Sequence, residues 1–106
     1  MDLNLFDAIV CGVFRVENLH AKSRVRRIVD AKKVCSKICY DHSDSTVQEI
    51  GNYLGLDHST ITFHLKASRD LIKLDKQFKD KYQKCLKTFI KLEKEISREE
   101  ILTSFF

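Results

Sequence analysis

The chain has 106 residues, of which 43% are hydrophobic and 32% are charged, enough for one domain with its own core. It has no proline and only three glycines, which excludes a protein built from short strands and tight turns. No apolar run approaches the roughly 18 residues of a membrane span, and no glycine pair precedes the Lys-Ser/Thr of a phosphate-binding loop. We therefore expect an all-α, compact helical bundle without a membrane, cofactor or small-molecule substrate.

The positive charge is concentrated in two stretches. The residues from Lys22 to Lys37 carry a net charge of +6, and so do those from Lys66 to Lys94, although the whole chain carries only +4. Such clustering is typical of nucleic-acid-binding proteins. A solvated lysine-rich helix face would give the same count in the second stretch. The first stretch includes three arginines, which favours contact with phosphates.

Apolar residues recur at helical spacing in five segments, so we predict five helices. The predicted helices cover about 3–14, 23–40, 47–54, 57–73 and 76–96. A short turn between Val16 and Leu19 is expected to pack back onto the first helix. The second helix is expected to bury Val25 together with residues further along the same face. Those further residues are Ile28, Ala31, Cys35 and Ile38.

Several polar residues and one glycine mark where these helices begin and end. Ser45 or Thr46 can cap the third helix, and Ser45 with Gln48 has the spacing of a capping box. Gly55 ends that helix, and Asp57 or Ser59 begins the next. Asp75 caps the last helix. Ser97 with Glu100 forms a second capping box, which predicts that 97–106 is a separate terminal helix or a tail.

The four cysteines allow two interpretations. Cys35 and Cys39 lie four residues apart with His42 close by, and Cys11 or Cys85 could complete a zinc site. However, there is no Cys-x-x-Cys pair. The simpler interpretation is that all four are small apolar core residues in a reducing cytosol, and we expect no metal.

A short helix, a glycine turn and a longer helix form the outline of a helix-turn-helix. The outer face of the longer helix is small and polar at its start and basic further along. Asp57, His58 and Ser59 can exchange hydrogen bonds with base edges, although Asp57 can instead cap the helix. Phe63 can contact a thymine methyl group or pack against a neighbouring helix. The other candidates on this helix are Thr62 for bases, and Thr60 and Lys66 for phosphates.

The residues around Asp57 resemble those of a known family. Gly55-Leu56-Asp57-His58-Ser59-Thr60-Ile61 is similar to the Asp-His-Ser/Thr-Thr-Val signature of the C-terminal DNA-binding domain of the bacterial chromosomal replication initiator DnaA. Lys22-Ser23-Arg24 resembles the family's Lys-Ser-Arg step. The segment Ile28 to Val34 resembles its Ile-Val-x-Ala-Arg-Gln-Ile. The resemblance covers about Leu5 to Phe89.

The resemblance implies a role for individual residues. The family's major-groove contacts fall on Asp57, His58 and Ser59, and its minor-groove arginine falls on Lys32. Its phosphate contacts fall on Arg24, Lys33, Thr46, Val47, Gln48 and Thr60. The first basic stretch, residues 22–37, is called the basic stripe below. It adds Arg26 and Arg27 as candidate phosphate contacts. Three positions depart from the family: Lys32 replaces an arginine, Leu56 a basic residue and Phe63 a histidine.

We therefore expect a protein that binds double-stranded DNA sequence-specifically. Residues 1–96 would form the DnaA-like domain and 97–106 a C-terminal extension. The 106 residues hold no ATPase module, and Met1 favours a stand-alone protein. Such a protein would act in the cytoplasm, on the nucleoid, as a regulator or replication accessory. The alternative is a protein-interaction adaptor that uses exposed Phe63 and the apolar end 101–106, which could also form a homodimer. An enzyme is not expected, because His20, His42, His58 and His64 form no nucleophile–base pattern.

Overall fold

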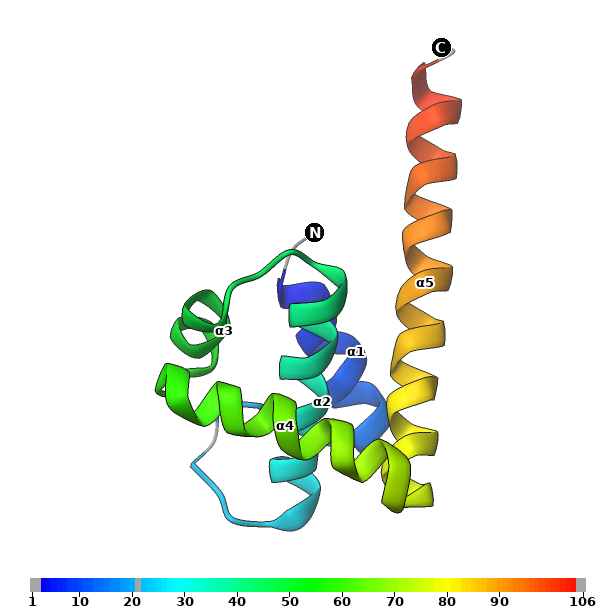
Figure 1. Cartoon of the computed structure of the whole chain (residues 1–106). Coiled ribbons are helices and arrows are strands. Elements are labelled where there is room, and N and C mark those ends of the chain that lie inside the picture. Colours follow the sequence, from blue (N-terminus) through cyan, green and yellow to red (C-terminus); the bar gives the residue numbers. More distant parts are fainter. Residues whose placement is uncertain (1–2, 21, 105–106) are drawn as a thin grey trace.

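The computed structural model describes residues 3–20 and 22–104, with side chains up to residue 95. These residues form five helices and no strand (Figure 1). The helices are α1 (Leu3–Phe14), α2 (Arg26–His42), α3 (Val47–Leu54), α4 (His58–Leu74) and α5 (Lys76–Ser104). The all-α prediction is confirmed, including the bounds predicted for α1 and α3.

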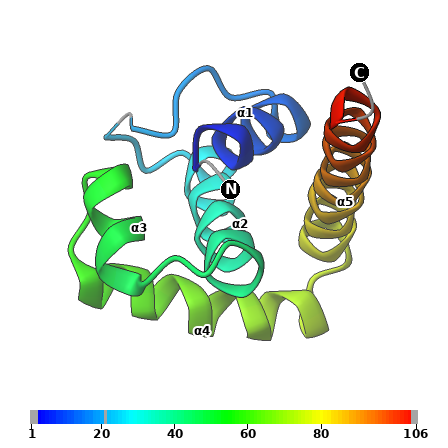
Figure 2. The same ribbon diagram turned by 90° about the horizontal axis from the view of Figure 1, so that it is seen from above.

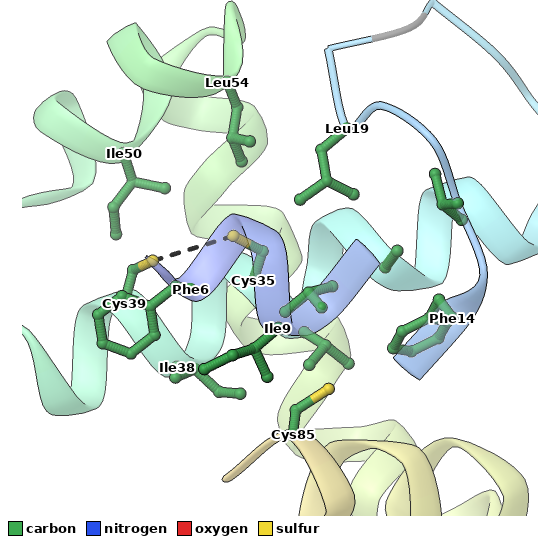
Figure 3. Packing of buried hydrophobic residues seen from close by; sticks show 14 of the residues in the cluster. Phe6, Ile9, Phe14, Leu19, Cys35, Ile38, Cys39, Ile50, Leu54 and Cys85 are labelled. Carbon is green, nitrogen blue, oxygen red and sulfur yellow. Dashed lines mark hydrogen bonds between the residues drawn. The ribbon is translucent and has the colours of Figure 1, made fainter. Parts of the chain in front are cut away.

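The helices surround α2. Viewed from above, α1, α3, α4 and α5 lie on its different sides (Figure 2). Their apolar faces meet in one core, part of which is drawn in Figure 3. The Phe6 ring of α1 and the Phe89 ring of α5 are central to it, with centroids 4.3 Å apart. Val16 and Leu19 are buried as predicted, so the segment after α1 packs back onto the core.

The start of α2 differs from the prediction. The helix begins at Arg26 and not at Ser23, and Val25 is exposed instead of buried. The Ser23 hydroxyl accepts a hydrogen bond from the Val25 amide at 3.2 Å. This local bond offers the backbone an alternative to the helix, so residues 22–25 form a non-helical segment before α2.

The capping box of α3 is shifted by one residue from the predicted one. Thr46 accepts a hydrogen bond from the Glu49 amide at 3.1 Å, and the Glu49 carboxylate accepts one from the Thr46 amide at 3.2 Å. Ser45 instead shares a hydrogen bond with Ser43 at 2.7 Å. The two possible boxes overlap in sequence, and the Thr46–Glu49 box has the stronger, charge-assisted bond.

The last helix is longer than predicted. Asp75 caps α5 as expected, because its Oδ1 accepts a hydrogen bond from the Phe78 amide at 3.2 Å. The helix then continues through Ser97 to Ser104, so the predicted new start at Ser97 is wrong. No glycine or proline lies between Lys76 and Ser104 to end it. Figure 1 shows the second half of α5 extending beyond the other helices.

Three of the four cysteines lie inside the bundle, whereas Cys11 is half-buried and its Sγ donates a hydrogen bond to Asp7 at 3.1 Å. Cys35, Cys39 and Cys85 are buried, and the sulfur atoms of Cys35 and Cys39 are 3.9 Å apart (Figure 3). Burial raises the pKa of the Cys85 thiol to about 12, so this thiol stays protonated. Among the side chains that the structure describes, no three His, Cys, Asp or Glu residues could hold a metal ion together. The interpretation of these three cysteines as core residues is confirmed.

Candidate nucleic-acid interface

Helices α3 and α4 form the helix-turn-helix. Gly55 ends α3 in the left-handed conformation, with φ 70° and ψ 32°, which glycine adopts without steric cost. Gly51 allows the turn to approach α3 closely, since a Cβ atom there would lie 2.6 Å from the Leu56 carbonyl oxygen. Ile61 and Leu65 bury the inner face of α4. The first turn of α4 is thereby held against α3 and opens toward solvent.

Asp57 and His58 present exposed polar groups at the start of α4. Asp57 is the N-cap residue, but its side chain makes no capping hydrogen bond, so the predicted capping role is wrong. Its Oδ1 instead lies 3.2 Å from Nδ1 of His58, and the two side chains are 69% and 72% exposed. The carboxylate orients the ring through Nδ1, which leaves Nε2 of His58 facing away from the pair.

The side chains that helical periodicity places on the outer face of α4 are the exposed ones in the structure. Ser59, Thr62, Phe63 and Lys66 are exposed, whereas Thr60 is half-buried. Phe63 is 62% exposed. The alternative interpretation, in which this ring packs against a neighbouring helix, is therefore wrong. The Thr62 hydroxyl donates to the His58 carbonyl at 3.1 Å. This bond fixes the Thr62 hydroxyl and leaves its oxygen as an acceptor.

The start of α3 offers backbone donors to an anion. The Thr46 side chain is occupied by the capping box, so this candidate phosphate contact has little side-chain capacity left. The amides of Val47 and Gln48 lie in the first turn, where no preceding helical carbonyl can accept from them. Val47 is half-buried and Gln48 is exposed. A phosphate here would therefore meet backbone N–H groups and the Gln48 amide.

The basic stripe is divided between free and paired side chains. Arg24, in the non-helical segment before α2, and Arg27, in the first turn of α2, are exposed. Arg26 is engaged, because its guanidinium lies 2.9 Å from Asp75 and 3.5 Å from Asp30. The bond to Asp75 ties the start of α2 to the junction of α4 and α5. Of these three candidate phosphate contacts, Arg24 and Arg27 form no ion pair with another described side chain.

Lys32 and Lys33 lie toward the contact between α2 and α4 and not on an open surface. Lys32 is 8% exposed, and Lys33 is half-buried. Ser68 of α4 donates a hydrogen bond to the Lys33 carbonyl at 3.1 Å, and the Ser36 hydroxyl donates to the Lys32 carbonyl at 2.8 Å. The Ser68 bond joins the two helices and helps to fix how α4 is oriented on α2, whereas the Ser36 bond lies within α2.

His64 lies in the same contact and makes stability depend on pH. It is 6% exposed, and its Nδ1 has no hydrogen-bond partner among the described residues. Burial, with the nearby charges of Lys33 and Lys32, lowers its pKa to about 4 from the usual 6.5. Below pH 6.5 the unfolded chain binds a proton at His64 that the folded chain excludes. We therefore expect the free energy of unfolding to fall between pH 6.5 and 4.

Urea unfolding at pH 7, 5.5 and 4.5 checks this expectation. In His64→Leu the decrease should be smaller than in the parent chain, because the leucine has no proton to gain. His42→Leu is the matched control, since this histidine is exposed and forms no ion pair among the described side chains. Equal slopes for the parent chain and His64→Leu would contradict the role of His64.

Two surface hollows are lined by residues that the sequence analysis did not include among the candidate contacts. A hollow of about 310 Å³ lies between α2, α3 and α4 and is lined in part by Val47, Tyr40 and Arg69. A second, of about 330 Å³, brings Arg15 next to Arg27. Tyr40, Arg69 and Arg15 are all exposed. Periodicity could indicate their exposure, but only the packing of the helices places them beside predicted contacts.

Known proteins match this chain over the region just described. The family described as "Bacterial dnaA protein helix-turn-helix" matches residues 7–67. The chromosomal replication initiator protein DnaA of Bacteroides fragilis (strain YCH46) is 32% identical over 74 residues, which are 67% of this chain and 16% of that protein. The protein of the same name from Bacteroides thetaiotaomicron is 30% identical over 78 residues, or 71% of this chain and 17% of that protein.

The chain thus spans about a sixth of the length of these two relatives. The matched residues 7–67 run from α1 into α4 and include the Asp57–His58 pair and the basic stripe. The resemblance inferred from the sequence is confirmed: the chain belongs to the family of bacterial DnaA helix-turn-helix domains, a family of DNA-binding modules.

Proposed function

We propose that the chain binds double-stranded DNA sequence-specifically, with the start of α4 in the major groove and the basic stripe on the flanking backbone. Phosphate contacts would supply most of the affinity, and contacts to base edges would supply discrimination. The chain would act on the nucleoid by occupying its site, as a transcriptional regulator or as an accessory to replication.

The exposed Asp57–His58 pair is the observation that carries this proposal. Nδ1 of His58 faces Oδ1 of Asp57 at 3.2 Å, and with the ring proton on Nδ1 the Nε2 atom is an acceptor. It would accept a hydrogen bond from the exocyclic amino group of adenine or cytosine. Oδ2 of Asp57 can accept from a neighbouring cytosine. Ser59 lies next to them and is exposed, so three successive residues would contact the bases.

The minor-groove role has two candidates. Lys32 is the position that the family resemblance indicates, but its side chain is buried and would have to leave the contact between α2 and α4. Arg24 is exposed in the non-helical, basic segment 22–25 directly before α2. Extended basic arms in front of a helix reach into the minor groove in other helix-turn-helix proteins. We therefore propose Arg24 as the minor-groove contact, while Lys32 remains the alternative.

Selection of duplexes from a random library, followed by binding of the selected duplex to His58→Ala, tests the function. Loss of the imidazole should cost about 1–3 kcal/mol on the selected duplex and little on a random one. Binding measured by fluorescence anisotropy at one fixed salt concentration gives both values. His20→Ala is the matched control, because this histidine is exposed on the segment after α1.

Two outcomes would overturn the proposal. If the selection enriches no sequence, sequence-specific binding is contradicted. Equal losses on the selected and random duplexes would show that His58 does not contact a base. In the first case, binding that still weakens with salt would leave a DNA-binding protein without specificity.

The exposed Phe63 ring favours a second candidate function, a protein-interaction adaptor. A large aromatic side chain that is 62% exposed is a typical anchor of a protein interface. The adaptor would bind both selected and random DNA weakly, with Kd above about 10⁻⁴ M even at low salt. The same anisotropy titration therefore distinguishes the two functions.

A further inference from the structure

The outer side of α5 carries a row of lysines that the proposed function does not use. Lys84, Lys87, Lys91 and Lys94 are all exposed. Projected at 100° per residue, they fall within about 80° of the helix circumference. They extend over about 15 Å at 1.5 Å per residue. We call these four residues the lysine ridge.

No carboxylate among the described side chains forms an ion pair with the lysine ridge, although Asp80 lies four residues before Lys84 on the same side of α5. Among the described side chains, none of its members forms an ion pair, and Glu95 makes no pair with Lys91 four residues before it. The basic stripe of α2 differs, because Arg26 pairs with Asp30 and Asp75. The four charges of the ridge therefore act together on an approaching anion.

The ridge is also separate from the start of α4. The opposite side of α5 buries Phe78, Cys85 and Phe89 in the core, so the ridge faces away from the bundle. Figure 2 shows α3 and the start of α4 on one side of α2 and α5 on the other. The 17 residues of α4 correspond to about 25 Å of helix between them. A short duplex seated on Asp57 and His58 would leave the ridge free.

We infer that the lysine ridge binds the phosphate backbone of a second DNA duplex, so that one chain bridges two duplexes. Lysine is a compact point charge that contacts phosphates without reading a sequence. A membrane surface would need a free apolar face, whereas the apolar face of α5 between Phe78 and Leu92 packs in or against the core. An acidic protein partner would call for aromatic or arginine anchors, and the ridge has neither.

Bridging rests on the proposed function for the first duplex only. The second duplex is held by the ridge whether or not the start of α4 prefers a sequence. The test therefore needs one arm that involves both duplexes and one that involves the ridge alone.

In the first arm, the selected duplex is fixed to beads through biotin and saturated with protein at 50 mM salt. A fluorescent random duplex of about 20 base pairs is then added, and the captured fluorescence is measured. We expect capture by the parent chain and at least about tenfold less by Lys87→Gln/Lys91→Gln. Lys73→Gln/Lys79→Gln is the matched control, because both lysines are exposed, Lys73 on α4 and Lys79 on α5 about 60° outside the ridge. It should retain capture.

The second arm measures binding of the random duplex in solution by anisotropy, without the selected duplex. Dependence on Lys87 and Lys91 here would support the ridge even if sequence specificity failed. Absence of capture by the parent chain, or equal capture by the two double variants, would overturn the inference. Capture only of duplexes that carry the selected sequence would also overturn it, because two paired copies would then hold one duplex each through α4.

Discussion

Phe89→Ala is expected to lower the free energy of unfolding by about 3–5 kcal/mol, the usual cost of removing a buried aromatic ring. Phe89 is buried on α5, and its ring lies 4.3 Å from that of Phe6 on α1. The substitution would leave a cavity between the two helices, and other parts of the core cannot fill it without moving a helix. Urea unfolding followed by circular dichroism measures the change.

The same substitution on the surface provides the control. Phe63 is 62% exposed on α4, so Phe63→Ala should change the free energy of unfolding by no more than about 0.5 kcal/mol. A similar loss for both variants would mean that Phe63 is buried in solution, for example between two copies of the chain. A small loss for Phe89→Ala would mean that α5 does not pack on α1 as described.

Gly51→Ala should disturb the fold and DNA binding together. The added Cβ atom would lie 2.6 Å from the Leu56 carbonyl oxygen and 3.6 Å from the His58 amide. A backbone oxygen cannot rotate away as a side chain can, so the turn before α4 must shift. We expect a loss of stability of about 3 kcal/mol, as for a severely overpacked site. We also expect a reduced preference for the selected duplex, because the shift moves Asp57 and His58.

Gly12→Ala is the matched control with an expected change of opposite sign. Gly12 lies in α1, and a Cβ atom there would meet nothing within 4 Å. Alanine should stabilise this helix by about 0.5–1 kcal/mol and leave DNA binding unchanged. Thermal unfolding and anisotropy with the selected duplex measure both quantities. If Gly51→Ala were also neutral or stabilising, the close approach of α3 and the turn would be contradicted.

Much of the fold could be predicted from the sequence because helix periodicity and caps are local. The bounds of α1 and α3, the turn at Gly55 and the cap at Asp75 depend on residues within a few positions of one another. The exposed face of α4 followed from the same periodicity. Errors arose where two local signals competed, as between Ser45 and Thr46 at the start of α3, or where a capping pattern at Ser97 was too weak to interrupt α5.

Composition, periodicity and one short motif by themselves determined an all-helical domain with a DnaA-like helix-turn-helix. Only the tertiary structure decided which basic side chains are exposed and which are buried or paired. It buries Lys32 between α2 and α4, and it pairs Arg26 with Asp75, 49 residues away, while Arg24 stays exposed. The reason is physical: a residue's helical face depends on its neighbours in sequence, whereas its burial and its ion pairs depend on which helix packs against that face.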